Sequence, residues 1–598
     1  MSYLKEIIYY FSVFRKHLGY RLYIVFLLTG LAAATEAFGI TLLLPLIELV
    51  ESDDPDAEIP GFTLMLRNLL ASIGIADSFV GILAFIAGIF VIKGAIKFTE
   101  GLYKAVLLSN LLREMKGNMI SYYQNMDYRY YTSQNTGHFV NIITQQVNRL
   151  LHAFEAYKKF LSEIIITIMY MLFAFLVSWK FALMATIAGF LILILFQKLN
   201  YYVKQLSRKT SDEYSSLHTF VVQTLQSFPY IAATAQFDHL GTRIMNSIYR
   251  LTNYMRRQQI AQAFTQAVRE PVSIFVILVI VILQITFFDA QIAPIIVSLL
   301  LIYRAMGHFM AIQTSWLQTM NMIGGLEMVE KEFEQIANNQ ETDGDIEIKD
   351  LSRGIKYNQV YFSYDNKSEP TLRDINLEIN VRETVAFFGP SGAGKSTMIN
   401  TLTLLLPPQK GSIYIDDNPH DRINRKSWRK QIGYVSQDMV MFDDTVANNI
   451  GLWSGDYNQD QHFRNSVEKA AERANCLDFI RNLPDGFNTK IGDRGVRLSG
   501  GQKQRLFIAR ELFKSPSLLI LDEATSSLDS ESEQAVRNRI QELKGKLTVV
   551  IITHQLSSIR EVDRIFVLKD NTIKSQGTFN ELIESDDDFR RLANSQTM

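Results

Sequence analysis

The residues best suited to chemistry begin with the run GPSGAGKS at 389–396, which follows the apolar stretch TVAFF. A glycine, four residues and then Gly-Lys-Ser is the spacing of a phosphate-binding loop between a strand and a helix. In such a loop backbone N–H groups surround a phosphate, the lysine contacts its oxygens and the serine hydroxyl binds Mg²⁺. We therefore expect a nucleotide site that contains Gly389, Pro390, Ser391, Gly392, Ala393, Gly394, Lys395, Ser396 and Thr397.

Two more apolar stretches end in polar side chains. SLLILDE (517–523) ends in two adjacent carboxylates, and LTVVIITH (547–554) ends in a histidine. Open α/β sheets bind ligands at the carboxyl ends of their strands. We expect Asp522 to bind the metal directly or through water, Glu523 to accept a proton from the attacking water, and His554 to contact the terminal phosphate. Each pattern alone also fits an ordinary loop or a structural histidine, but the phosphate loop favours the chemical interpretation.

The run LSGGQ at 498–502 precedes a predicted helix. Two adjacent glycines expose backbone N–H groups, and Ser499 adds a hydroxyl. Unsatisfied amides and the dipole at a helix N-terminus favour a bound anion. The sequence therefore indicates an anion site at Ser499, Gly500, Gly501 and Gln502, although the run by itself fits a Gly-Gly turn at the start of an ordinary helix.

Length and composition limit the classes of protein. A chain of 598 residues is too long for one hydrophobic core, so at least two domains are expected. Lys and Arg total 60 and Asp and Glu total 61, and this balance predicts no nucleic acid partner. The single Cys476 cannot form an intramolecular disulfide, and its apolar surroundings predict a small buried residue rather than a nucleophile.

Long apolar stretches occur before residue 320, and each approaches or exceeds the roughly 20 residues that cross a bilayer as a helix. Any one of them fits a buried core helix, but six within this part of the chain predict a membrane domain. The stretches centre on 22–47, 78–103, 160–179, 181–199, 271–288 and 292–316.

Basic residues set the expected orientation. They precede the first span and are frequent in the connections between spans two and three and between spans four and five. The positive-inside rule places these segments in the cytoplasm, together with both termini. The two connections are polar and favour helices, so we expect the spans to continue beyond the membrane. The N-terminal stretch 3–18 fits an interfacial helix or an extension of the first span.

The predicted fold class is an α-helical six-span membrane domain followed by an α/β P-loop nucleotide-binding domain. The expected boundaries are 1–335 for the membrane domain with its helical extensions, 336–346 for a polar linker and 347–598 for the nucleotide-binding domain.

The phosphate loop, LSGGQ, the Asp-Glu pair and the strand-final histidine resemble, in order and spacing, the motifs of ATP-binding cassette (ABC) proteins over about 345–598. The resemblance implies ATP and Mg²⁺ as cofactors, with Tyr364 stacked on adenine and Gln437 linking the metal to the membrane domain. It implies that SSLD (526–529) crosses between subunits. The implied metal ligands are Ser396, Gln437 and Asp522, and the implied catalytic residues are Glu523, His554 and Lys395.

In that family two cassettes pair head to tail, and LSGGQ of one caps the ATP bound by the other. One membrane domain ahead of one cassette resembles the half-transporters of the type IV exporters, which implies a homodimer with two equivalent sites. TKIGDRG (489–495) and the segments 130–147 and 227–238 resemble the parts of these exporters that connect cassette and membrane domain. ATP is then expected to switch a cavity from inward-facing to outward-facing.

Ionisable residues inside the spans indicate where cargo binds. Charged groups at depth tend to face a cavity or a partner, which applies to Glu36, Lys93, Lys97, Arg304 and His308. Arg304 and His308 are four apart and share a helix face. We expect Glu36, Arg304 and His308 to contact substrate. A structural Glu36–Arg304 ion pair is the alternative, and Lys97 also fits a side chain that extends to the inner interface.

TEAFGITLLLPLIEL (35–49) and IYRAMGHF (302–309) resemble the matching spans of bacterial flippases for lipid-linked oligosaccharides, and 51–78 is long enough for a small external helix. This resemblance implies ATP-driven flipping or export of a glycolipid across a bacterial inner membrane, with the cassette in the cytoplasm and membrane lipids as partners. An exporter of peptides or hydrophobic drugs is the first alternative. An ATP-gated channel or regulatory membrane ATPase is the second, although Glu523 and His554 favour sustained turnover.

Overall fold

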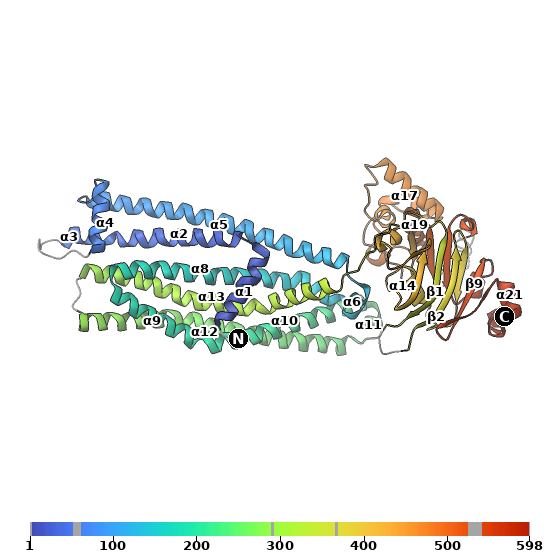
Figure 1. Cartoon of the computed structure of the whole chain (residues 1–598), viewed down its shortest axis with the longest axis horizontal. Coiled ribbons are helices and arrows are strands. Elements are labelled where there is room, and N and C mark those ends of the chain that lie inside the picture. The colour runs from blue at the N-terminus through green and yellow to red at the C-terminus, as the bar shows by residue number, and fades with distance from the viewer. Residues whose placement is uncertain (1–2, 52–60, 289–291, 365–368, 524–540, 597–598) are drawn as a thin grey trace. The chain divides into compact units, whose positions relative to one another are not determined.

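The computed structural model describes residues 3–51, 61–288, 292–364, 369–523 and 541–596. The chain divides into two compact units, Met1–Gln340 and Glu341–Met598. Helices make up the first unit and strands with helices the second (Figure 1). The division falls inside the expected linker 336–346, whose first three residues still belong to the last helix of the membrane unit.

Long apolar helices dominate the first unit. Within the described residues five helices are long and apolar enough to cross a membrane, or six if α9 and α10, which meet at a 40° bend, form one span. The predicted fourth span 181–199 is thus interrupted at Phe196, where the apolar run gives way to Gln197 and Lys198. The main helices are α2 (Arg21–Thr41), α5 (Phe79–Gln124), α8 (Val147–Val177), α9 (Trp179–Leu195), α10 (Gln197–Gln226), α12 (Phe237–Phe288) and α13 (Ile292–Asn338).

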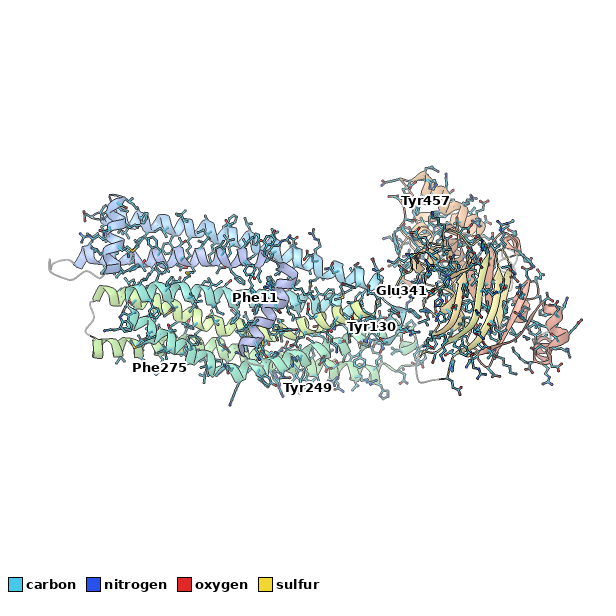
Figure 2. The ribbon with its side chains drawn as sticks, viewed as in Figure 1. Phe11, Tyr130, Tyr249, Phe275, Glu341 and Tyr457 are labelled. Atoms are coloured by element: carbon cyan, nitrogen blue, oxygen red, sulfur yellow. The ribbon has the colours of Figure 1, made fainter. Side chains whose placement is uncertain are left out.

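The predicted helical extensions are confirmed. α5 has 46 residues, α12 has 52 and α13 has 47. At 1.5 Å per residue α5 is about 69 Å long, more than twice the roughly 30 Å of a bilayer's hydrocarbon layer. Figure 2 labels Phe275, an α12 side chain that is 67% exposed. Exposed apolar side chains of this kind suit a helix surrounded by lipid.

Shorter helices join the long ones. The N-terminal stretch forms α1 (Tyr3–Leu18), a helix separate from α2 and therefore not a continuous extension of the first span. It packs across other helices: Tyr157 Oη donates to Ile7 O at 2.8 Å, and Lys204 Nζ donates to Glu6 Oε1 at 3.0 Å. The small external helix expected within 51–78 is present as α4 (Gly61–Ser72), after α3 (Leu43–Glu51).

A buried carboxylate fixes the first of the segments that resemble connecting elements of exporters. Residues 130–147 include parts of α6 (Tyr128–Ser133) and α7 (Thr136–Asn141) and the π-helical turn Ile142–Gln146. Glu332 of α13, with a side chain 1% exposed, lies 2.8 Å from His138 Nε2 and accepts from Tyr130 Oη at 3.1 Å. The short helices are therefore held to the end of α13. The segment 227–238 forms α11 (Phe228–Ala233) and the start of α12.

Two sheets organise the second unit. An antiparallel sheet has the order β2-β1-β4-β5. The larger sheet has the order β10-β9-β3-β8-β7-β6, in which β9, β3, β8, β7 and β6 are parallel and β10 is antiparallel at one edge. The strands are β1 (Gly354–Phe362), β2 (Leu372–Asn380), β3 (Thr384–Phe388), β4 (Lys410–Ile415), β5 (Asn418–Pro419), β6 (Ile432–Val435), β7 (Leu518–Asp522), β8 (Thr548–Thr553), β9 (Arg564–Lys569) and β10 (Thr572–Gly577).

Burial explains the sequence of the central strands. Every residue of β3 and β8 is buried, as expected for parallel strands covered on both faces. Cys476 is also fully buried as predicted, and burial raises the pKa of its thiol. The helices of this unit are α14 (Lys395–Leu402), α15 (Arg425–Lys430), α16 (Val446–Gly451), α17 (Gln461–Arg473), α18 (Leu477–Arg481), α19 (Gly500–Phe513), α21 (Phe579–Ser585) and α22 (Asp587–Gln596).

Close contact between α10 and α13 predicts a stability effect at Gly324. Its N–H donates to Ser207 Oγ at 3.1 Å, and an added Cβ would lie 2.6 Å from Ser207 O. Gly324→Ala must separate the helices, so we expect it to lower thermal stability by about 1–3 kcal/mol. Gly117→Ala in α5 is the control because its Cβ would meet no atom within 4 Å. Equal melting temperatures for the two variants would contradict this account of the contact.

Candidate functional site

The predicted chemical residues meet at the carboxyl edge of the parallel sheet. β3, β8, β7 and β6 are adjacent in that order, with Phe388 paired to Thr553 and Asp522 to Ile552. The phosphate loop follows β3, His554 follows β8, and Glu523 follows β7. Since parallel strands present their carboxyl ends on one side, three distant segments of the chain converge there.

The loop between β3 and α14 has the backbone that a phosphate site needs. Gly392 and Gly394 have φ values of 83° and 94°, a left-handed region that side chains disfavour. Gly394 is the N-cap of α14, so the free N–H groups of the first helical turn point toward the loop, where a phosphate would lie. Lys395 Nζ donates to Gly389 O at 2.7 Å and to Pro390 O at 2.9 Å. The ammonium therefore lies against the loop that phosphate oxygens would enter.

Burial and charge perturb the two groups nearest the loop. Burial lowers the pKa of Lys395, and the carboxylates of Glu523 and Asp522 oppose this shift. Burial also raises the pKa of Asp522, whose Oδ2 accepts from Tyr434 Oη at 3.3 Å. A cation beside Asp522 would favour the charged carboxylate again. At this edge of the sheet Asp522 can therefore stabilise a bound cation, and Lys395 can stabilise a bound anion.

The proposed Mg²⁺ ligands have suitable donor chemistry. Ser396 offers an exposed hydroxyl, Gln437 a side-chain carbonyl and Asp522 a carboxylate. These hard oxygen donors match the preference of Mg²⁺, which is usually held by one or two carboxylates together with phosphate oxygens and water. The residues present therefore fit Mg²⁺ bound with a nucleotide.

The Glu523 carboxylate is held from two sides. Gln437 Nε2 donates to Oε2 at 2.9 Å, and His554 Nδ1 lies 2.9 Å from Oε1. The Glu523 backbone N–H donates to Ile552 O at 2.8 Å, which fixes the residue beside β8. A carboxylate positioned in this way can accept a proton from a water molecule at the sheet edge.

An aromatic side chain lies next to the phosphate loop. Tyr364 is 54% exposed, and its hydroxyl is 3.3 Å from Thr397 Oγ1 in α14. Its ring meets Phe362 edge-on, with 5.1 Å between ring centroids. The exposed ring can therefore stack on a base whose phosphates lie in the loop, as proposed from the sequence.

The LSGGQ residues form the predicted helix start. Ser499 is the N-cap of α19: its Oγ accepts from Gln502 N at 3.3 Å, while Gln502 Oε1 accepts from Ser499 N at 2.9 Å. Ser499 and Gly500 are exposed. In the described residues no hydrogen bond joins this run to the phosphate loop of the same chain. The expected SSLD loop (526–529) lies outside the described residues.

A charged cavity of about 400 Å³ lies in the membrane unit among α2, α5, α8 and α13. Glu36 and His308, two of the three predicted substrate contacts, line this cavity, whereas Arg304 is exposed on α13 and is not part of the lining. Five lysines and four glutamates make the cavity strongly polar: Lys93, Lys97, Lys104, Lys158, Lys159, Glu36, Glu100, Glu155 and Glu163.

Glu36 forms an ion pair in this cavity, but its partner is not Arg304, the one considered from the sequence. Glu36 Oε2 lies 2.7 Å from Lys93 Nζ, so the Glu36–Arg304 pair is wrong. The neighbouring helix α5 brings Lys93 closer than α13 brings Arg304. His308 Nδ1 lies 2.6 Å from Glu163 Oε2. Charges at this depth are therefore largely neutralised in pairs.

Lys97 and Glu100 belong to the same cavity. Glu100 is 4% exposed, accepts from Thr29 Oγ1 at 2.6 Å and forms an ion pair with Lys104. Lys97 lines the cavity and forms no ion pair within the described residues. Lys97 is also exposed, so its place in the cavity wall leaves the expected extension to the inner interface as a prediction.

Sequence reasoning missed some members of both sites. Tyr434 was not identified because a tyrosine in a short strand carries no distinctive pattern. Glu163 was also missed, yet it stands inside the predicted third span, where an ionisable residue is a signal of function. Lys158 and Lys159 were missed because they lie at the edge of that span, where lysines are common.

Known proteins match both units. A family model described as "ABC transporter transmembrane region" matches residues 22–305, and one described as "ABC transporter" matches 372–526. An "ATP-dependent lipid A-core flippase" of Hahella chejuensis is 30% identical over 522 residues, 85% of this chain and 86% of that protein. The "Uncharacterized ABC transporter ATP-binding protein YwjA" of Bacillus subtilis is 30% identical over 523 residues, 85% and 88% of the two chains.

Solved structures share the fold. The structure titled "Structure of a bacterial Atm1-family ABC exporter with ATP bound" has a TM-score of 0.79 and covers 97% of this chain and 99% of that one. At 22% identity this likeness concerns the fold alone.

The geometry around Glu523 predicts the effect of removing its charge. If Glu523 accepts the proton of water, Glu523→Gln keeps Mg-ATP binding but slows hydrolysis by at least about 10²-fold. Glu472→Gln, an exposed change on α17, is the charge-matched control. Single-turnover hydrolysis and nucleotide affinity are the measurements. Near-normal hydrolysis in Glu523→Gln would remove this residue from the proton transfer.

Proposed function

Since the chain belongs to the ABC transporter family, we propose that it exports or flips an amphiphilic lipid. It is an ATP hydrolase coupled to transmembrane transport. The proposed cargo is a lipid-linked oligosaccharide or another glycolipid with an anionic headgroup. The proposed setting is a bacterial inner membrane, with the cassette in the cytoplasm.

The charged cavity in the membrane unit is the observation that carries the cargo proposal. Its volume of about 400 Å³ lies in the range of small-ligand sites, and its wall mixes acidic, basic and hydroxyl side chains. A purely hydrophobic drug would offer no partner to the lysines of the wall that form no ion pair within the described residues. A headgroup that carries phosphate and sugar hydroxyls would satisfy them.

The unpaired lysines give the cavity its preference for anions. Within the described residues, Lys97, Lys158 and Lys159 lie in the wall without an ion pair, whereas Lys93, Lys104 and His308 each face a glutamate. Lysine ammonium groups bind phosphate as point charges. We propose that they hold the headgroup and that Arg304, exposed on α13, is a further contact.

Relatives named "ATP-dependent lipid A-core flippase" support a lipid cargo, because that name describes the movement of a lipid.

A peptide exporter remains the alternative within transport. An ATP-gated channel would need no cavity that selects a headgroup, and ion current in the absence of lipid movement would favour it.

The ATP site proposed here is shared between two copies of the chain. The exposed N-terminus of α19 would cap the ATP held by the phosphate loop of a second copy. Mg²⁺ would supply charge neutralisation of the phosphates. This chain's residues would do the rest: the loop amides and Lys395 orient the phosphates, Glu523 takes the proton from water, and His554 and Gln437 keep its carboxylate in place.

A mixed-dimer experiment tests head-to-tail sharing. With Lys395→Ala in one chain and Ser499→Arg in the other, both lesions fall in one site and the second site stays intact. With both changes in one chain, each site carries one lesion. We expect ATP-dependent closure and hydrolysis to be retained better in the first arrangement. Equal values at matched dimer yield would contradict cross-chain sharing.

The cavity predicts which lysines the cargo needs. Lys97→Gln with Lys159→Gln removes two charges without leaving a carboxylate unpaired, so we expect glycolipid-stimulated hydrolysis and flipping to fall at least about tenfold. Lys116→Gln with Lys198→Gln is the charge-matched control, because neither lysine lines the cavity. The measurements are flipping in liposomes, ATP affinity and melting temperature. Unchanged flipping in a stable double variant would overturn the proposed headgroup site.

A further inference from the structure

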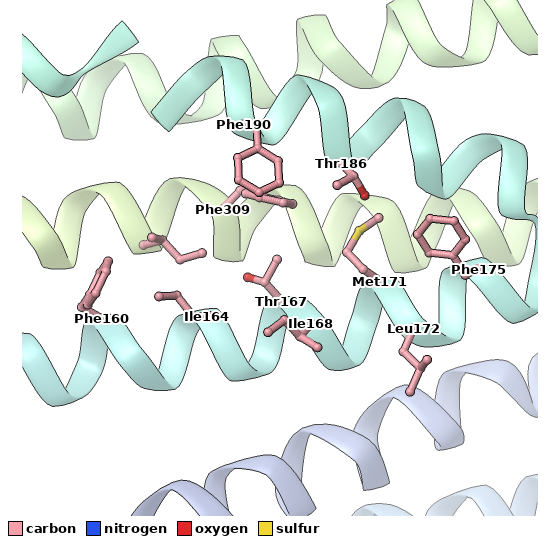
Figure 3. A pocket seen from close by; sticks show the side chains of 11 residues that line it. Phe160, Ile164, Thr167, Ile168, Met171, Leu172, Phe175, Thr186, Phe190 and Phe309 are labelled. Atoms are coloured by element: carbon pink, nitrogen blue, oxygen red, sulfur yellow. The ribbon is translucent and has the colours of Figure 1, made fainter. Parts of the chain in front are cut away.

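A second cavity, of about 480 Å³, lies among α8, α9 and α13 of the membrane unit. Eleven side chains line it, of which nine are apolar and two are threonines. Figure 3 shows Phe190 and Thr186 of α9 facing Thr167 and Met171 of α8, with Phe309 of α13 beside them. None of these residues lines the charged cavity.

The two threonines do not make this groove polar. Thr167 Oγ1 donates to Glu163 O at 2.7 Å, and Thr186 Oγ1 donates to Ala182 O at 2.8 Å. Each hydroxyl hydrogen is therefore used within its own helix. A ligand in the groove meets methyl groups, methylene groups and aromatic rings, so the matching ligand has no polar groups along its length.

The shape of the groove identifies the kind of apolar ligand. The lining on α8 runs from Phe160 to Phe175, which is about 22 Å along a helix axis. The volume of about 480 Å³ is spread over this length, so the groove is elongated along α8. An elongated groove without polar groups matches an extended hydrocarbon chain.

The groove has a buried floor and an exposed rim. Phe160 and Phe309 are 1% and 6% exposed, whereas Ile168 and Phe190 are 57% and 60% exposed. α8 and α9 carry the predicted third and fourth spans, so this rim lies at the depth of the acyl chains in a bilayer. An unfilled groove would cost its lining the dispersion contacts of a packed interior.

We propose that this groove binds one acyl chain of a membrane phospholipid. The chain lies along α8, between Phe190 and Phe309, and its headgroup stays outside the groove. α8 and α13 line both the groove and the charged cavity, but no residue lines both. The proposed lipid site is therefore separate from the proposed cargo site.

Photolabelling of the full-length protein tests the proposal. The probe is a phosphatidylcholine with a diazirine in the middle of one acyl chain, in phosphatidylcholine nanodiscs. We expect labelling of Ile168 and Met171 to exceed that of Leu183 and Leu191, which are exposed on α9 outside the lining, by about tenfold. Equal labelling inside and outside the groove would overturn the proposal.

A filled groove provides the matched variant. Thr186→Phe places a ring in the groove and is expected to abolish the excess labelling, whereas Leu183→Phe on the same helix leaves it unchanged. Ile168→Trp, read out at Met171, fills the groove from α8 if Thr186→Phe does not fold. Excess labelling that persists in a folded, filled variant would overturn the site. Crosslinks across the groove between two copies of the chain would also overturn it. The same holds if labelling is obtained only with a transported glycolipid as the probe.

Discussion

Charged groups removed from water must be stabilised by other charges or by hydrogen bonds, and both units of this chain are arranged around that requirement. In the membrane unit Lys93 faces Glu36 and His308 faces Glu163, so a polar cavity can exist among apolar helices. In the second unit Lys395 lies near two carboxylates at the end of β7. We propose that each place takes a further charged ligand, an anionic headgroup in the first and Mg²⁺ with phosphate in the second.

Helix α8 lines both the charged cavity and the apolar groove, with different residues in each. Lys159 and Ser162 lie in the charged wall, whereas Ile164 and Ile168 lie in the apolar groove. Residues on one side of a helix recur at intervals of three or four, which is how one apolar span carries a polar stripe. The close contact of α10 with α13 at Gly324 fixes these helices at short range.

Much of the second unit could be predicted from sequence because its signals are local. Apolar runs define β3, β7 and β8, and the motif residues stand directly after them. The ion pair of Glu36 with Lys93 could not be predicted. A charged residue inside an apolar span indicates that a partner exists, but it does not indicate which helix carries that partner. Gln502 is a similar case. The LSGGQ run predicted that it belongs to an anion site, whereas in the structure its side-chain oxygen accepts a hydrogen bond from Ser499 N at the start of its own helix. The bend at Phe196 falls where the apolar run gives way to Gln197 and Lys198, but neither residue type by itself marks a break in a helix.

The hydrogen bonds of Lys395 to Gly389 and Pro390 have a consequence for the thermodynamics of nucleotide binding. The glycines with positive φ and the hydrogen bonds of Lys395 to its own loop restrict the backbone there, and the conformational entropy of ordering such a segment is lost during folding. A phosphate that enters replaces two carbonyl acceptors with charged oxygens, which form stronger hydrogen bonds with an ammonium. Phosphate oxygens would therefore compete with these carbonyl oxygens for the ammonium, and the affinity depends on the difference between the two sets of acceptors.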